Sequence, residues 1–347
     1  MKTKLQLAAL ALLLSTINYQ LSTAFAQGSL TPPGAPAPMM KTLDQIEART
    51  PISQLPFTIN TGGSYYLTGN LSTGASNAIV IAASGVTLDL NGFTIYSTVI
   101  LAQNGGTAIL LNDGITDVTV QNGHIFSGVV HTGLGYFGSG FGSGIVGGAS
   151  GITIRNISVS GCLFQGIAVG TLGATLVDSC LVQTVGNSGI QAAAVRNSIA
   201  LDCGLDGIYC SQAFDSRAES TASGNGIYAW ITANNCNGVS SNQAGVYTQN
   251  ALNCSGYSTS GTGLYASATA QNCYGSSGSG SGLIATTAQN CYGYSNGSGY
   301  GIFASTAQNC YSSSYSGTGL SAFIANVCHG ITTSGTALSA THNVNSY

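Results

Sequence analysis

The sequence predicts an all-β solenoid, and three observations support this fold class. A glycine followed by Ile, Val or Leu returns about every eighteen or nineteen residues through the C-terminal half. Cysteines return at the same interval, and apolar residues alternate with polar ones inside each unit. Such fixed repeats are typical of units that stack because none can bury its apolar face alone. The anchor glycines are Gly207, Gly226, Gly245, Gly263, Gly282, Gly301 and Gly319, and the cysteines are Cys236, Cys254, Cys273, Cys291, Cys310 and Cys328.

The unit that begins at Gly263 shows how one repeat is built. Successive side chains of a strand point to opposite faces, so Leu264 is expected inside when Tyr265 is outside. Asn272 is expected to turn the chain, and Cys273 to point inward again. Stacked repeats then align like residues in ladders. The inward ladder is Ile208, Ile227, Val246, Leu264, Leu283, Ile302 and Leu320, and an asparagine ladder is Asn235, Asn253, Asn272, Asn290 and Asn309.

These apolar ladders and Asn-Cys turns resemble the right-handed parallel β-helix of the pectin-lyase-like superfamily, where inward asparagine ladders recur. The resemblance covers about residues 52–347 and implies a right-handed parallel β-helix, here of about fourteen rungs. It specifies fold better than activity. The paired Asp motifs of the polygalacturonase branch and the Arg-x-Pro-x-x-Arg motif of the pectate lyase branch are both missing. The Pro-rich run and the segment Met40-Lys41-Thr42-Leu43-Asp44-Gln45-Ile46-Glu47 resemble the leader of secreted bacterial β-helix repeat proteins of unassigned function.

The N-terminal residues predict export. Residues 1–26 combine Lys2 and Lys4, a short apolar run and Ala24-Phe25-Ala26, which is typical of a cleavable signal peptide. An uncleaved anchor is the alternative, although the run is short for a membrane span. We expect a secreted protein, extracellular, periplasmic or at the cell surface, with no membrane span after cleavage. Residues 27–39 form a Pro-rich linker, 40–51 a short helical cap over the first open edge, and 52–347 one β-helix domain.

An insertion at about residues 127–143 lengthens one rung of the N-terminal half. It carries His131, Tyr136, Phe137 and Phe141 among glycines. His124 and His131 have no visible acidic or nucleophilic partner in the sequence, so turn roles are expected for both.

Composition excludes some functions. Only 5% of residues are charged, and no Asp, Glu, Lys or Arg follows Glu219. Without a basic patch, nucleic acid is not an expected partner. The cysteine ladder accepts serine at Ser198, which favours buried packing thiols, with some bridging, such as Cys203–Cys210, as the alternative. No Cys-x-x-Cys pair is present, so no metal site or cofactor is expected.

Charge concentrates once inside the repeats, which leaves an enzyme as the alternative function. A glycoside hydrolase needs two placed carboxylates, and a polysaccharide lyase needs carboxylates for calcium and a base. Turn caps and surface ion pairs explain the same residues equally well, and we lean against an enzyme. The catalytic candidates under this alternative are Asp178, Arg196, Asp202, Asp206, Asp215 and Arg217.

Outward aromatic residues are the predicted binding surface. Tyrosines in vertical register could stack against sugar rings or against a second copy, although β-propensity alone also selects Tyr on an exposed sheet. No regular outward threonine row is visible, which argues against an ice-binding array. The sequence thus predicts a structural or binding solenoid for polysaccharide, a cell-surface polymer, protein or self-association. The binding candidates are Tyr209, Tyr228, Tyr247 and Tyr265, with Tyr136 and Phe137 on the insertion, and a second stripe is Tyr274, Tyr292 and Tyr311.

Overall fold

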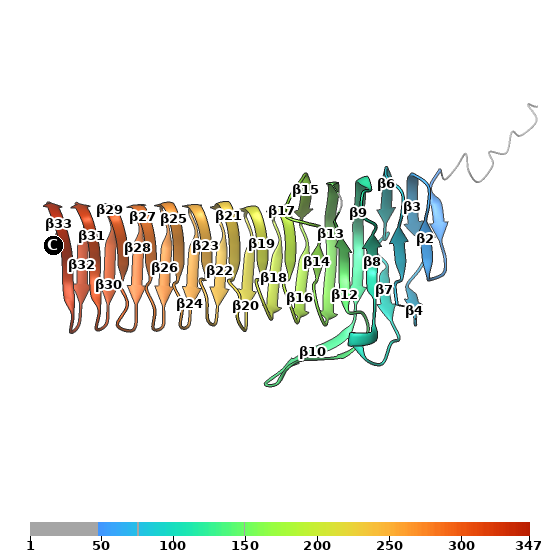
Figure 1. Cartoon of the computed structure of the whole chain (residues 1–347), viewed down its shortest axis with the longest axis horizontal. Coiled ribbons are helices and arrows are strands. Elements are labelled where there is room, and N and C mark those ends of the chain that lie inside the picture. The colour runs from blue at the N-terminus through green and yellow to red at the C-terminus, as the bar shows by residue number, and fades with distance from the viewer. Residues whose placement is uncertain (1–47, 75, 149) are drawn as a thin grey trace, which may run out of the picture. The chain divides into compact units, whose positions relative to one another are not determined.

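The computed structural model describes residues 48–74, 76–148 and 150–347, and Arg49–Tyr347 forms one compact unit. This unit is a parallel β-solenoid in which strands of successive rungs lie side by side (Figure 1). The predicted signal peptide, the linker and residues 40–47 of the predicted cap lie outside the described residues. Residues 50 and 51 of that cap belong to a strand, β1 (Thr50–Ile52). The described residues include no helix of the length and hydrophobicity that a membrane crossing needs.

The N-terminal rungs contain three stacks of parallel strands. Within a stack, each strand pairs with the strand at the same place in the following rung. In the stack that contains β1, these pairings continue to β15. The first stack is β2 (Phe57–Ile59), β5 (Ile79–Ile81), β8 (Thr107–Leu111), β12 (Ser143–Gly147) and β14 (Ile167–Ala168). The second is β1, β3 (Gly63–Leu67), β6 (Val86–Asp89), the first halves of β9 (Thr116–Phe126) and β13 (Ser150–Cys162), and β15 (Thr175–Asp178). The third starts with β4 (Leu71–Thr73) and β7 (Thr94–Ser97) and continues through the second halves of β9 and β13.

From β17 onward the first two stacks merge into one long strand per rung. Ile190 of β17 pairs with Ile167 of β14, while Arg196 at its other end pairs with Asp178 of β15. The long strands are β17 (Ile190–Arg196), β19 (Ile208–Phe214), β21 (Ile227–Asn234), β23 (Val246–Leu252), β25 (Leu264–Gln271), β27 (Leu283–Gln289), β29 (Ile302–Gln308), β31 (Thr318–Asn326) and β33 (Thr336–Val344). The stack from β1 to β33 thus has six strands before the merger and nine after it, which gives fifteen levels where fourteen were predicted.

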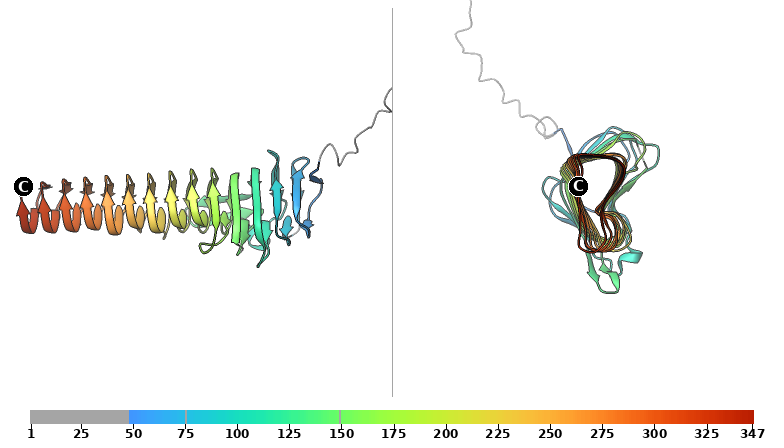
Figure 2. Two further views of the ribbon diagram at one scale, coloured as in Figure 1. Left: turned by 90° about the horizontal axis from the view of Figure 1, so that it is seen from above. Right: turned by 90° about the vertical axis from the view of Figure 1, so that its left-hand side faces the viewer.

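A short strand completes each of the later rungs, and it continues the third stack. These strands are β16 (Leu181–Val185), β18 (Ile199–Cys203), β20 (Arg217–Ser220), β22 (Asn237–Ser240), β24 (Ser255–Ser258), β26 (Tyr274–Ser277), β28 (Tyr292–Ser295), β30 (Tyr311–Ser314) and β32 (His329–Thr332). Seen along the solenoid, the later rungs superpose closely (Figure 2). One 3₁₀ turn, η1 (Ala102–Asn104), lies before β8.

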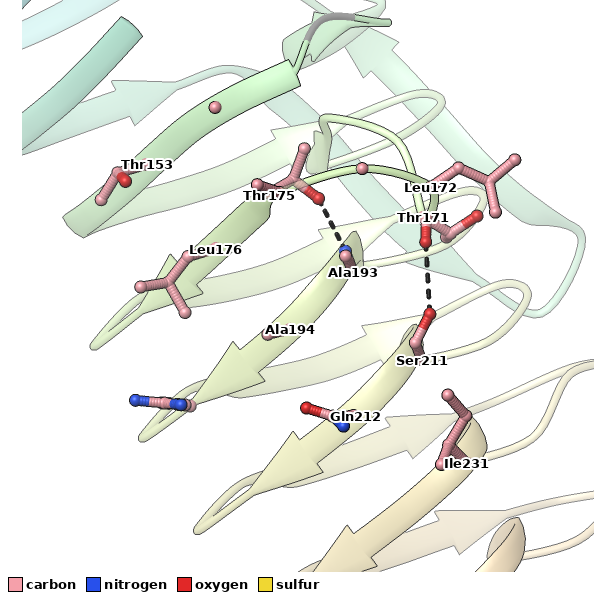
Figure 3. A pocket seen from close by; sticks show the side chains of 14 residues that line it. Thr153, Thr171, Leu172, Thr175, Leu176, Ala193, Ala194, Ser211, Gln212 and Ile231 are labelled. Carbon is pink, nitrogen blue, oxygen red and sulfur yellow. Dashed lines mark hydrogen bonds between the residues drawn. The ribbon is translucent and has the colours of Figure 1, made fainter. Parts of the chain in front are cut away.

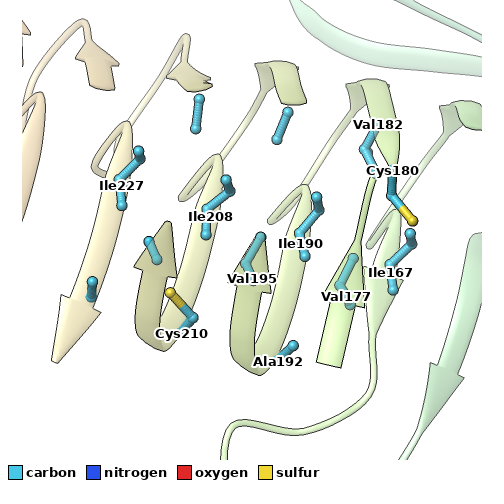
Figure 4. Close-up of a cluster of buried hydrophobic side chains, with 14 of the residues drawn as sticks. Ile167, Val177, Cys180, Val182, Ile190, Ala192, Val195, Ile208, Cys210 and Ile227 are labelled. Atoms are coloured by element: carbon cyan, nitrogen blue, oxygen red, sulfur yellow. The ribbon is translucent and has the colours of Figure 1, made fainter. Parts of the chain in front are cut away.

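The core is the predicted inward ladder. Leu264 is fully buried and lies in register between Val246 and Leu283, while Tyr265 faces outward. Close to the merger, Ile167, Ile190, Ile208 and Ile227 form one file of branched side chains (Figure 4). Each fully buried Leu or Ile contributes about 1.5–3 kcal/mol relative to an exposed one. This repeated burial supplies the stacking energy that a single rung lacks.

The anchor glycines are required because the backbone of the short strand lies directly against the start of the long one. A Cβ at Gly263 would lie 2.3 Å from the amide nitrogen of Ser276 and 2.6 Å from the carbonyl oxygen of Gly282. Any side chain there would collide with backbone of two rungs. The repeat Gly-[Ile/Val/Leu] therefore encodes a close approach followed by a core residue.

A left-handed residue turns each rung between the long and the short strand. Asn272 has φ 54°, and equivalent asparagines in neighbouring rungs have similar values. Asn tolerates this conformation better than most residues. Its side chain is exposed, so the expectation of an inward asparagine ladder is wrong. The residues at this position with positive φ are Asn91, Asn122, Asn156, Ser179, Asn197, Asp215, Asn235, Asn253, Asn272, Asn290, Asn309, Val327 and Asn345.

All ten cysteines are buried free thiols. Burial raises the pKa of Cys162 and of Cys180 to about 12. Cys180 shares its position with Ser198, whose hydroxyl accepts a hydrogen bond from the Cys180 amide. Serine thus replaces cysteine in this ladder without disturbing the turn.

One outward row contradicts the sequence interpretation. Thr269, Thr287 and Thr306 are aligned on the outer face of three successive long strands. A short threonine row therefore exists, beside a parallel row of glutamines formed by Gln271, Gln289 and Gln308.

Candidate functional sites

A shallow groove follows the corner between the long and short strands, and we call it the corner groove. One wall is the column of left-handed turn residues, and the other is the column of first residues of the short strands. It contains a hollow of about 440 Å³ over the rungs of Asn197 to Asn237 and one of about 540 Å³ from Asn253 to Tyr311. The second wall is Ile199, Arg217, Asn237, Ser255, Tyr274, Tyr292, Tyr311 and His329.

The asparagine wall is a hydrogen-bonded ladder. The Nδ2 of Asn272 donates to Oδ1 of Asn253 at 3.2 Å, and Asn290 donates to Asn272 at the same distance. Asn309 continues the ladder to Asn290 at 3.3 Å. An amide has two N–H groups and an oxygen with two lone pairs. Each rung within the ladder therefore retains one donor and one acceptor that can face a ligand.

The opposite wall is a stack of aromatic rings. The ring centroids of Tyr274 and Tyr292 lie 5.3 Å apart and nearly parallel, and those of Tyr292 and Tyr311 lie 5.2 Å apart. His329 and Tyr347 extend the stack in tilted contacts. Because the ring faces cover one another, the rings present edges and hydroxyl groups. The second tyrosine stripe of the sequence thus becomes one wall of a groove, which its spacing alone did not indicate.

The N-terminal end of the corner groove carries charge. Asp215 occupies the left-handed position and accepts a hydrogen bond from Nδ2 of Asn235 at 2.6 Å. Arg217 lies on the opposite wall of the same hollow. Asp178 accepts from Nδ2 of Asn197 at 3.0 Å. Asp178 and Asp215 therefore serve the turn ladder as asparagine-like acceptors.

The insertion is an antiparallel hairpin, β10 (Gly128–Thr132) and β11 (Gly135–Ser139), that projects from the solenoid (Figure 1). It contacts later rungs through Asp202. Nδ1 of His131 lies 2.6 Å from Oδ1 of Asp202, and the hydroxyl of Tyr136 donates to the same oxygen at 2.9 Å. The rings of His131 and Tyr136 stack at 4.3 Å. Tyr136 also shares a 2.7 Å hydrogen bond with Thr221, and burial raises its pKa.

This contact corrects two interpretations. His131 has an acidic partner after all, and Asp202 anchors a hairpin. The sequence contained one signal, because His131 and Tyr136 lie close together in the insertion. It did not indicate the direction in which the insertion folds. A hollow of about 410 Å³ beside the contact is lined by His131, Asp202 and the hydroxyls of Ser127, Ser160 and Thr184. Phe137 of the same hairpin is exposed.

Asp206 lies at a different corner, in the loop before β19. It accepts hydrogen bonds from the backbone nitrogen of Asn225 at 2.7 Å and from its Nδ2 at 3.0 Å. Asn225 repeats the arrangement one rung later by accepting from the amide of Ala244. Burial raises the pKa of Asp206 above its ordinary 3.8, although both hydrogen bonds from Asn225 oppose the shift. Asp206 is thus a turn residue that asparagine replaces in the next rung.

Replacing Asp206 by asparagine is therefore expected to preserve or slightly raise stability at pH 7. A carboxyl whose pKa is higher in the folded chain destabilises the fold at pH values above both its pKa values. The penalty disappears as the pH falls through the folded pKa toward the unfolded one. Denaturant midpoints of both proteins at pH 7 and near pH 4 would measure the effect. The variant's advantage should shrink on acidification, and a clear loss of stability at pH 7 would contradict this interpretation.

The first tyrosine stripe lies on the outer face of the long strands. Tyr228 and Tyr247 stack at 4.7 Å, as do Tyr247 and Tyr265, and Tyr209 joins in a tilted contact at 5.2 Å. Their ring faces are covered within the stack, so flat stacking on sugars is restricted to its ends. The next residue in this row is Ile284, which lies between Tyr265 and Phe303. The tyrosine stripe therefore ends at Tyr265.

Arg196 lines a separate pocket of about 720 Å³ near the merger of the stacks (Figure 3). A loop that begins at Gly170 overhangs it, held by a hydrogen bond from Ser211 to the carbonyl of Thr171. Leu172 and Ile231 expose apolar surface at its rim. Arg196 is the one charged residue among those that line this pocket, and its guanidinium lies 5.4 Å from the ring centre of Phe214.

Of the six catalytic candidates, Asp215 and Arg217 share one hollow, and the others lie elsewhere. Asp202 binds the hairpin, Asp206 lies in a loop at another corner, and Arg196 lines its own pocket. Within the described part of the chain, no three His, Cys, Asp or Glu side chains converge on a point that could hold a metal ion.

Comparison with known proteins finds only distant structural likenesses. No protein-family model matches the chain, and no curated protein matches its sequence. Among solved structures, the Dettilon tailspike protein is similar at 12% identity and a TM-score of 0.36 over 84% of this chain. The catalytic domain of GH87 alpha-1,3-glucanase in complex with nigerose is similar at 12% identity and 0.40 over 86%. This chain spans 61% and 62% of the length of those two chains.

Proposed function

We propose that the protein is a binding solenoid that holds a linear, uncharged polysaccharide along the corner groove. One observation carries this proposal: from Asn253 to Tyr311, aligned amides face aligned tyrosines across a continuous hollow. Both walls repeat with the rung, so each sugar unit of an extended chain meets the same kind of neighbours. The amides offer one donor and one acceptor per rung, and sugar hydroxyls complement both.

Affinity in this arrangement comes from repetition. A single amide–hydroxyl hydrogen bond contributes only about 1 kcal/mol net, because water competes for both partners. Several rungs engaged at once make each further contact intramolecular, which multiplies the affinity without any strong single contact. The absence of charged residues after Glu219 favours uncharged polymers over uronates, which would find no cation along these rungs.

The alternative function is a carbohydrate-active enzyme near residues 178–219. The hydrogen bonds argue against it, because the carboxylates there accept from turn groups or from the hairpin. General acid–base cleavage of a glycoside needs two carboxyl groups on either side of one bond. We therefore expect no depolymerisation of pectin, alginate or related glycans.

Affinity electrophoresis through gels that contain xylan, soluble β-glucan, polygalacturonate or alginate would test the proposal. We expect retardation by an uncharged polymer, and about thirtyfold weaker affinity for Asn290→Ala combined with Tyr292→Ala, since at least two contacts of about 1 kcal/mol each are lost. Tyr247→Ala is the matched control, because it removes a stacked tyrosine outside the groove. Equal losses in both variants would overturn the assignment to the corner groove. Turnover of a uronate polymer that Asp202→Asn abolishes would support the enzyme instead.

A further inference from the structure

A row of thiols runs beside the corner groove, formed by the six repeating cysteines and called here the cysteine row. Cys254, Cys273 and Cys291 line the hollow between the asparagine and tyrosine walls. Each of the six side chains is 1–3% exposed. They follow one another in register across five successive pairs of rungs. The row consists of Cys236, Cys254, Cys273, Cys291, Cys310 and Cys328.

All six thiols have the same orientation. Each Sγ contacts the carbonyl oxygen two residues earlier, at 3.1 Å for Cys273 and 3.2 Å for Cys254 and Cys291. The other three do the same at 3.2–3.3 Å. Side chains in one orientation on in-register strands repeat with the strand spacing, which is about 4.8 Å. The 4.7 Å separation of the stacked Tyr228 and Tyr247 rings shows this spacing in the same rungs.

That spacing is wrong for a disulfide and for a tetrahedral metal site. A disulfide brings two sulfurs to about 2.05 Å with Cβ atoms aimed at each other, whereas these are parallel. Zinc takes four ligands around one point, and no three suitable side chains converge in the described residues. At the length of a zinc–thiolate bond, about 2.3 Å, two metal–sulfur bonds placed end to end span about 4.6 Å, close to one rung.

We propose that the cysteine row binds soft monovalent d¹⁰ cations of the copper(I) and silver(I) kind, each held linearly between thiolates of two successive rungs. Soft thiolates select copper(I)-like cations over hard cations such as calcium, and the lack of four converging ligands, rather than the donor type, disfavours zinc. Two S–H bonds break, two sulfur–metal bonds form, and two protons leave to solvent, while the metal keeps its charge. Six thiols pair as 236 with 254, 273 with 291, and 310 with 328, which gives three ions per chain.

The remaining cysteines lack this arrangement. Ser198 and Ser216 separate Cys180 from the cysteine row, so Cys180 has no thiol one rung away at its position. Cys162 is fully buried in the core, as are Cys203 and Cys210. These four thiols provide the internal control. If binding requires thiols in adjacent rungs of the cysteine row, removing thiols elsewhere should not change the number of bound ions.

The test is a titration of the folded, reduced protein with silver(I), and with copper(I) buffered by bicinchoninate without oxygen, read by native mass spectrometry. We expect three ions. Replacing Cys254, Cys291 and Cys328 by serine keeps three row thiols but no adjacent pair, and should abolish binding. The matched triple Cys162→Ser, Cys180→Ser and Cys210→Ser should still bind three.

Serine already occupies this ladder position at Ser198 and Ser216, so the row variant should fold, which circular dichroism would check. Ions bound in proportion to the remaining thiols, or equal losses in both triples, would overturn the proposal. Spontaneous loss of the row thiols to disulfides in the folded protein would overturn it as well. Polysaccharide retention is a separate readout, so failure of the metal site would not affect the proposed function.

Discussion

Gly282→Ala is expected to destabilise the protein by at least about 3 kcal/mol, near the top of the range for overpacked cores. The added methyl would lie 2.4 Å from the amide nitrogen and 2.6 Å from the carbonyl oxygen of Tyr294. It would also lie 2.7 Å from the carbonyl oxygen of Gly301 in the following rung. These are backbone atoms of two rungs held by strand pairing, so no rotamer change relieves the contact.

The matched control is Gly69→Ala. A Cβ at Gly69 meets nothing within 4 Å, and its φ is compatible with any residue. Denaturant unfolding followed by circular dichroism would compare both variants with the parent. We expect little change for Gly69→Ala, and for Gly282→Ala a transition that starts in the rungs around Gly282, since a solenoid is stabilised mainly by nearest neighbours. Similar midpoints for the two variants would mean that the rungs do not approach as closely as described.

The sequence was sufficient for the fold because local pattern and global stacking use the same residues. Gly282 marks a close approach, Leu283 fills the core beside it, and Ala288 does so again after the bend. Each of these positions requires a side chain of a certain size or on a certain face. The same requirement recurs in every rung, so the repeat of the sequence reveals it. The burial of the cysteines followed directly from that pattern, and the predicted count of about fourteen rungs differs by one from the fifteen found.

The direction of the asparagines did not follow from alternation. Gln271 faces outward, and strict alternation would place Asn272 inward. At φ 54°, however, Asn272 turns the corner, so two consecutive side chains lie outside before Cys273 returns to the core. This reversal creates the corner groove, because it places an amide row and a tyrosine row on either side of the cysteine row. Positive φ is a backbone property that residue type only suggests.

The hairpin contact was beyond the sequence for a different reason. His131 and Asp202 are 71 positions apart, and nothing in a glycine-rich insertion fixes which rungs it covers. The structure shows that Tyr136 reaches two rungs beyond β16, to Thr221. Long-range contacts of an insertion depend on its complete geometry, whereas the repeat depends on spacing alone.

Substitutions at two adjacent positions, one facing inward and one facing outward, should differ sharply in the stability that they cost. Leu264→Ser is expected to cost about 3–5 kcal/mol, because it leaves a cavity beside Val246 and Leu283 and buries a hydroxyl. Tyr265→Ser removes one stacked contact with Tyr247, worth about 0.5–1.5 kcal/mol, from a side chain that is already partly solvated. Urea unfolding of both variants gives the comparison. Since the two residues are neighbours in sequence, they share rung, strand and local backbone, and only the direction of the side chain differs. Equal destabilisation would show that the register of β25 is shifted by one residue.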